Sequence, residues 1–151
     1  MQRFKILLVD DEIDFLETIV NRLSKRKIEA KGVVSGEAAL DALKSEPYDV
    51  VVLDIKMPGG MDGIETLREI KRIRPRVEVL LLTGHASVET SIEGMRQGAF
   101  DYLLKPMKFD DLLTKLGQAF EKKAVQDKKI QDATIQERFG PHDGEREREM
   151  E

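Results

Sequence analysis

The chain contains the run Val50-Val51-Val52-Leu53-Asp54, in which four consecutive apolar residues end at an acid. Such a run predicts a strand covered on both faces, as in the middle of a parallel sheet. Three other short apolar runs end in the same manner at charged or hydroxyl side chains. They are residues 4–9 before Asp10 and Asp11, residues 77–82 before Thr83, and residues 100–104 before Lys105. Because the carboxyl ends of parallel strands converge on one crevice, we expect these three acids, the hydroxyl and the ammonium to share one pocket.

Segments with helical periodicity separate these runs, which is the pattern of repeated βα units around a parallel sheet. The first predicted helix covers residues 12–27. Its apolar face consists of Phe15, Leu16, Ile19, Val20 and Leu23. A weaker second strand is predicted at residues 31–34. Ser35 is then expected to cap a helix that runs to Leu43 and closes before Pro47.

The second half of the sequence continues the alternation. A turn-rich loop at residues 57–63 leads into a predicted helix at residues 64–73, which Pro75 ends. Another helix is predicted at residues 86–97, followed by Gly98 as a left-handed C-cap. The residues of that helix expected to face inward are Val88, Ile92 and Met95. The apolar residues of the last predicted helix are Leu112, Leu113, Leu116, Ala119 and Phe120. Five βα repeats are then complete, so we predict an α/β fold.

Length and composition bound the organisation of the chain. Its 151 residues suffice for one domain with a substantial core, predicted at residues 1–122. Residues 123–151 contain few apolar side chains, so we expect a charged helical extension followed by a disordered polar tail. The charged ending favours a stand-alone protein. The alternative is that the chain is a fragment of a larger protein.

Charge and cysteine content exclude several classes of function. A net charge of -4 gives no electrostatic reason to bind nucleic acid or an anionic membrane. The absence of cysteine removes disulfides, thiolate catalysis and thiolate metal sites, and it fits a reducing compartment. No apolar run approaches the roughly 20 residues of a membrane helix. We therefore expect a cytoplasmic protein.

The predicted pocket has the groups that phosphoryl transfer to a carboxylate needs. A carboxylate that accepts a phosphoryl group approaches an anionic donor, so positive charge must lie nearby. Asp10 and Asp11 could bind Mg²⁺ together with Asp54, because this ion takes a few carboxylates and also accepts phosphate oxygens. Lys105 would supply a second cation to the phosphoryl oxygens, and the Thr83 hydroxyl would donate a hydrogen bond to one of them.

Six short motifs together resemble the receiver domain of two-component response regulators over residues 4 to about 120. They are Leu8-Val9-Asp10-Asp11-Glu12, Leu53-Asp54-Ile55-Lys56-Met57-Pro58, Met61-Asp62-Gly63, Leu81-Leu82-Thr83-Gly84-His85-Ala86, Gly98-Ala99-Phe100-Asp101-Tyr102 and Leu104-Lys105-Pro106. Each motif alone is weak, but their order and spacing are specific. The resemblance implies a flavodoxin-like (βα)5 doubly wound parallel sheet with strand order 2-1-3-4-5.

The resemblance also implies partners and residue roles. Asp54 would be phosphorylated by a sensor histidine kinase or a phosphotransfer protein. The backbone carbonyl of Lys56 would join the acids in binding Mg²⁺. Thr83 and Tyr102 would form a switch that biases the surface of the fourth helix, fifth strand and fifth helix, through which the chain would contact a downstream protein or form a homodimer. Lys56 and His85 would tune hydrolysis of the phosphoryl group.

Three local features concern how closely the chain follows the family. Pro106 matches the family's proline after the lysine, which usually follows a cis bond. The loop after Pro58 has one glycine more than the commonest form, which should loosen it without moving the acids. Lys108 occupies a place where many members have a helix-capping side chain, so the start of the last helix should be less firmly fixed.

Several alternatives stay open from the sequence. Asp10 and Asp11 could serve merely as helix caps, without binding a metal. Asp54 could be a structural carboxylate, and Tyr102 could be a packing residue. An aspartate-nucleophile phosphatase would need an acid two residues after Asp54, where Lys56 stands. Two further hypotheses are that the chain is a receiver fragment of a multidomain transcriptional activator, or that it is an interaction module that does not depend on phosphorylation. Because transfer and hydrolysis would act on the chain itself, we do not expect an enzyme.

Overall fold

The computed structural model describes residues 4–84 and 88–139, in which five strands alternate with five helices. The strands are β1 (Lys5–Val9), β2 (Glu29–Val33), β3 (Val50–Asp54), β4 (Glu78–Thr83) and β5 (Asp101–Leu104). The helices are α1 (Ile13–Lys25), α2 (Gly36–Ser45), α3 (Gly63–Ile73), α4 (Val88–Arg96) and α5 (Phe109–Phe139). The predicted alternation of βα units is confirmed.

The five strands form one parallel sheet in the order β2-β1-β3-β4-β5, which confirms the predicted doubly wound topology. The register aligns the carboxyl ends of the central strands, since Val9 lies beside Leu53 and Asp54 lies beside Leu82. The apolar runs that define β3 and β4 are buried along their whole length. The residues that follow each strand therefore emerge at the same edge of the sheet.

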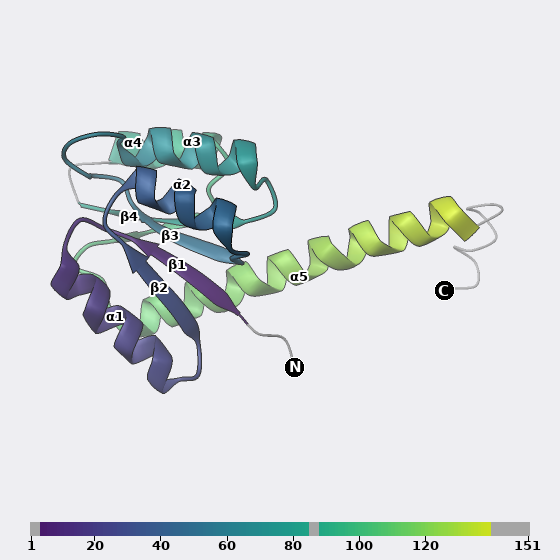
Figure 1. Cartoon of the computed structure of the whole chain (residues 1–151), viewed down its shortest axis with the longest axis horizontal. Coiled ribbons are helices and arrows are strands. Elements are labelled where there is room, and N and C mark those ends of the chain that lie inside the picture. The colour runs from purple at the N-terminus through teal and green to yellow at the C-terminus, as the bar shows by residue number, and fades with distance from the viewer. Residues whose placement is uncertain (1–3, 85–87, 140–151) are drawn as a thin grey trace.

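Helices cover both faces of the sheet and enclose two apolar clusters. One face is covered by α2, α3 and α4, and the other by α1 and α5 (Figure 1). The first cluster contains side chains such as Leu7 and Val51, and the second contains their strand neighbours Leu8 and Val52. Adjacent residues of β1 and β3 point to opposite faces, as expected for strands buried on both sides.

Local signals in the sequence place most of the helix ends. The Ser35 hydroxyl accepts a hydrogen bond from the Ala38 amide at 3.1 Å, which confirms the predicted N-cap of α2. Gly98 has a φ of +102°, which confirms the left-handed turn after α4. Helix α1 ends two residues earlier than predicted, because Lys27 adopts a φ of +62° and turns the chain toward β2. Strand β2 also begins two residues earlier, where Glu29 pairs with Lys5.

The predicted inward face of the fourth helix is wrong. Ile92 is 51% exposed and Met95 is 40% exposed, while Ser91 and Gly94 face the sheet and are buried. A Cβ on Gly94 would overlap the side chain of Leu81, so the helix lies too close to the sheet for a large side chain on its inner face. The start at residue 86 and the side chain of Val88 lie outside the described residues.

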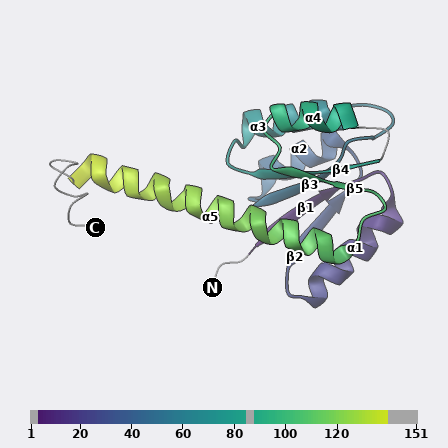
Figure 2. The same cartoon turned by 180° about the vertical axis from the view of Figure 1, so that it is seen from behind.

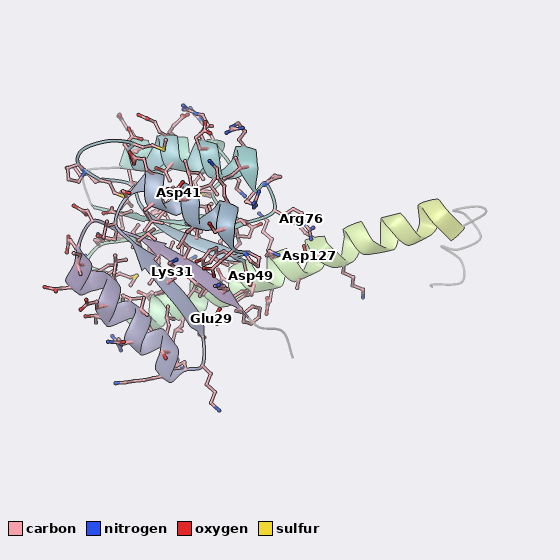
Figure 3. All side chains as sticks on the ribbon, in the orientation of Figure 1. Glu29, Lys31, Asp41, Asp49, Arg76 and Asp127 are labelled. Atoms are coloured by element: carbon pink, nitrogen blue, oxygen red, sulfur yellow. The ribbon has the colours of Figure 1, made fainter. Side chains whose placement is uncertain are left out.

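Helix α5 is one continuous helix across the boundary predicted at residue 122, and it extends well beyond the sheet (Figure 2). Ion pairs attach its middle to the amino edge of the sheet. Lys122 reaches Glu78 at 3.3 Å, and Asp127 pairs with Arg76, whose side chain points toward it (Figure 3). The tail predicted to be disordered lies, from residue 140 on, outside the described residues. No described helix is both long and apolar enough to span a bilayer.

Candidate functional site: an acidic pocket with a central lysine

Four of the five predicted site residues come together with their charged or hydroxyl groups at the carboxyl edge of the sheet. Asp10 follows β1, Asp54 ends β3, Thr83 ends β4 and Lys105 follows β5. The Lys105 ammonium donates to Asp10 Oδ2 at 2.8 Å and to Asp54 Oδ2 at 3.3 Å. One cation thus bridges two carboxylates from different strands. The fifth residue, Asp11, lies at the exposed rim of the same edge.

Burial and charge together set the proton affinity of the two central groups. Burial raises the pKa of Asp54, and the nearby Asp10 charge raises it further, while Lys105 and the Lys56 amide oppose the shift. The Lys56 amide donates to Asp54 Oδ1 at 3.2 Å. Burial lowers the pKa of Lys105, but its hydrogen bond to Asp10 and the charges of Asp54 and Asp10 outweigh burial and raise that pKa. Lys105 therefore remains an ammonium at neutral pH.

The acids after β1 form a group suited to a hard divalent cation. One carboxylate oxygen from each of Asp10, Asp11 and Glu12 lies within 4.8 Å of the others. Oxygen donors of this kind, on one buried and two exposed acids beside open solvent, fit Mg²⁺, which binds few carboxylates and keeps several waters. Glu12 was not among the predicted ligands, although it adjoins the two aspartates in sequence. Asp54 shares the Lys105 ammonium with Asp10 of this group.

The pocket opens into a cleft of about 680 Å³ above Asp54. It is lined by Asp11, Glu12, Asp54, Ile55, Lys56, Met57, Pro58, Asp62, Ile64, Gly84, Thr90 and Lys105. Asp62 caps α3, since its carboxylate accepts from the Glu65 amide at 2.8 Å. Sequence reasoning did not assign Asp62, Ile64 or Thr90 to the site. The open side of the cleft gives solvent and small molecules access to an otherwise buried carboxylate.

Residues 6–117 match the family described as "Response regulator receiver domain". The chain belongs to this family. It is 40% identical over 114 residues to the transcriptional regulatory protein ZraR of Escherichia coli K12, covering 76% of this chain and 26% of ZraR. It is 39% identical over 108 residues to the E. coli regulatory protein AtoC, covering 72% of this chain and 23% of AtoC. The chain thus spans about a quarter of the curated relatives it matches.

A solved receiver domain has the same architecture. The receiver domain of NtrX from Brucella abortus superposes with a TM-score of 0.73 at 35% identity, covering 77% of this chain and 98% of that one. This likeness agrees with the strand order and with the helices on both faces of the sheet. The predicted receiver fold is therefore confirmed from both sequence and structure.

The side chains that would read the phosphoryl state in this receiver make no hydrogen bond with the Asp54 carboxylate among the described residues. Thr83 is buried, and its hydroxyl donates to the Gly84 carbonyl at 3.2 Å. Tyr102 is 42% exposed and pairs with Leu81 in the register of β4 and β5. Lys56 extends an exposed side chain at the cleft. His85 lies outside the described residues. The roles of these residues stay predictions.

The two loops that frame the receiver pocket have defined conformations. The Lys105–Pro106 bond is cis, as the resemblance implied. Gly59 and Gly60 both have positive φ angles, and the Met61 amide donates to the Glu37 carboxylate at 3.4 Å. The extra glycine is therefore accommodated in a loop that contacts α2.

Backbone hydrogen bonds close the first turn of α5. The Lys108 carbonyl accepts from the amides of Asp111 and Leu112 at 3.1 and 3.2 Å. A lysine side chain has no acceptor with which to cap these amides. The Lys108 side chain therefore does not cap this helix, and backbone hydrogen bonds close its first turn.

Proposed function

We propose that this receiver domain is a phosphorylation-activated switch, in which Asp54 accepts a phosphoryl group from a sensor histidine kinase or a phosphotransfer protein. The observation that carries the proposal is the Lys105 ammonium, 3.3 Å from one oxygen of a nearly buried carboxylate at the floor of an open cleft. A fixed cation beside an acceptor oxygen is the arrangement that phosphoryl transfer needs, because the transferring oxygens carry negative charge.

The proposed step forms one bond and breaks one. An Asp54 oxygen attacks the phosphorus of the donor phosphohistidine, an O–P bond forms, the P–N bond breaks, and the released imidazole nitrogen takes up a proton. The raised pKa of Asp54 makes its ionised carboxylate more basic than an ordinary aspartate. Lys105 would bind a phosphoryl oxygen, and Thr83 would turn its hydroxyl from Gly84 toward another. Water would later hydrolyse the acyl phosphate, so the chain would act on itself and not as an enzyme.

Mg²⁺ is the proposed cofactor. Asp10, Asp11 and Asp54 would hold it with the backbone carbonyl of Lys56, and the geometry adds Glu12 as a candidate. When bound, the ion would offset the charge of the acids and accept a phosphoryl oxygen as a ligand. The acidic group at the end of β1 supports this assignment.

The proposed output surface is the face formed by α4, β5 and the start of α5. Four large apolar side chains on it are 40–51% exposed: Ile92, Met95, Tyr102 and Leu104. Exposed apolar side chains gathered on one face mark an interaction site more often than scattered ones do. The Thr83 and Tyr102 switch would change this face, to which a downstream protein or a second copy of the chain would bind.

A role in transcription is a second proposal, supported by the relatives. ZraR and NtrC, which is 34% identical over 119 residues, are named as transcriptional regulators. The receiver would then control a transcriptional regulator of which this sequence is one part. The cytoplasmic location predicted from the sequence remains a prediction.

The deciding experiment is intact-mass measurement with Mg²⁺ and acetyl phosphate. We expect the wild type to gain one labile phosphoryl group and Asp54→Asn to gain none. Asp41→Asn is the matched control, because Asp41 is an exposed acid on α2, away from the cleft (Figure 3). A wild type that gains no phosphoryl group would favour an interaction module that keeps the receiver fold without the switch.

A further inference from the structure

The lysine at the centre of the pocket has an aromatic neighbour in addition to its two acids. The Lys105 ammonium lies over the ring of Phe15, 5.1 Å from the ring centroid. A cation within about 6 Å of an aromatic face is attracted by the ring quadrupole. Phe15 stands on α1, is half-buried and packs against the apolar cluster under that helix. Helical periodicity alone assigns this residue to the core face of α1.

The Phe15 ring differs from the carboxylates of Asp10 and Asp54 because it has no other role in the proposed chemistry. Asp10 is a proposed Mg²⁺ ligand, and Asp54 is the proposed phosphoacceptor, so neither carboxylate serves Lys105 alone. Lysine is a point charge on a flexible four-carbon stem, and the Lys105 side chain is 24% exposed. Without a neutral partner, the ammonium would be free to swing toward solvent whenever the acids are engaged elsewhere.

We propose that Phe15 is a positioning residue for Lys105, whose ring holds the ammonium over the phosphoacceptor pocket. This inference rests on the proposed function and deepens it. Phe15 does not touch the reacting atoms, and its effect on transfer passes through the lysine. The contact also connects α1 with the residue that follows β5.

The first test reads the position of the lysine without metal or phosphodonor. Protons over an aromatic face experience an upfield ring-current shift, so the ε-methylene resonance of Lys105 should lie upfield of the resonances of lysines that face no ring. Lys5 over Tyr48 and Lys122 over Phe100 should also be shifted, and their shifts should not change in the Phe15 variants. We expect Phe15→Leu to remove this shift and Phe15→Tyr to retain it. Phe4→Leu is the matched control, because Phe4 is also half-buried against the same apolar cluster but stacks on Phe120.

The second test measures the rate of phosphorylation by acetyl phosphate at saturating Mg²⁺, together with the Mg²⁺ dissociation constant. We expect Phe15→Leu to slow phosphorylation by roughly threefold to tenfold, the range that one cation–π contact supplies. The Mg²⁺ dissociation constant should change by less than about twofold, and Phe15→Tyr should restore the rate. A residue that only packs α1 would weaken metal binding and phosphorylation together.

The ring-current shift and the phosphorylation rates together decide whether Phe15 positions Lys105 or only packs α1. An unshifted Lys105 resonance in the wild type, or a Phe15→Leu rate equal to that of the wild type, would overturn the positioning role. Equal slowing in Phe15→Leu and Phe4→Leu would assign Phe15 to packing and also overturn it. If the wild type takes no phosphoryl group, the proposed function fails, and the ring-current shift still decides whether Phe15 holds the lysine.

Discussion

Lys105 donates a hydrogen bond to Asp10 at 2.8 Å, although the two residues are 95 positions apart in the sequence. The contact joins the segment after β5 to the segment after β1, across the two strands, β3 and β4, that lie between them in the sheet. It neutralises part of the charge of two buried acids that would otherwise repel each other. The same ammonium is placed where the proposed reaction would need a cation.

Replacing the central lysine should slow phosphoryl transfer strongly. We expect Lys105→Met to slow phosphorylation of Asp54 by acetyl phosphate about 100-fold, since the loss of one preorganised charge-stabilising group typically costs this much. Rates followed by intact mass would check this. Lys44→Met, at an exposed lysine on α2, should phosphorylate like the wild type. Wild-type rates in Lys105→Met would remove the lysine from the mechanism.

The raised pKa of Asp54 predicts how stability varies with pH. The folded state holds the Asp54 proton to higher pH than the unfolded state, so ionising this group on raising the pH costs folding free energy. In metal-free buffer, Asp54→Asn should therefore gain stability relative to the wild type as the pH rises from about 3.8 toward neutrality. Urea unfolding at several pH values measures the difference. A difference that is constant or shrinks would contradict the raised pKa.

Two helical glycines should respond to alanine in opposite directions. A Cβ on Gly94 would overlap Leu81, so Gly94→Ala should reduce the free energy of unfolding by about 1–3 kcal/mol. A Cβ on Gly117 of α5 would meet open space among the described residues, so Gly117→Ala should add roughly 0.5–1 kcal/mol. Thermal or urea unfolding of both variants would check this. Equal effects would contradict the close approach of α4 to the sheet.

The ion pair at the opposite edge of the sheet should anchor α5. Glu78 is almost completely buried, and its carboxylate lies 3.3 Å from the Lys122 ammonium. Lys122→Met should lower the free energy of unfolding by about 1–3 kcal/mol, because it removes the ammonium that pairs with a buried carboxylate, although Lys122 itself is partly exposed. Adding Glu78→Gln should recover part of the loss. Urea unfolding would measure both.

A surface lysine further along α5 provides the control for that pair. Lys128→Met should stay within about 0.5 kcal/mol of the wild type, since Lys128 is exposed. If Lys122→Met behaved like Lys128→Met, the buried Glu78 would have to be stabilised by other groups.

Sequence reasoning succeeded where one local signal has one structural outcome. The short β-branched run before Asp54 favoured a buried strand, and Ser35 and Gly98 marked helix ends through their own side-chain and backbone preferences. It was wrong for α4, because apolar spacing shows which residues share a face but not which face meets the sheet. The close approach at Gly94 turned the side carrying Ile92 outward.

The sequence by itself determined the element order, the strand-end acids and the family, because each depends on residue type and spacing along the chain. Only the tertiary structure decided which atoms meet: Lys105 between Asp10 and Asp54, Phe15 beneath the ammonium, and Glu12 among the candidate ligands. Those contacts depend on strand register and on how far each helix lies from the sheet. Packing in three dimensions fixes these quantities, and no local pattern encodes them.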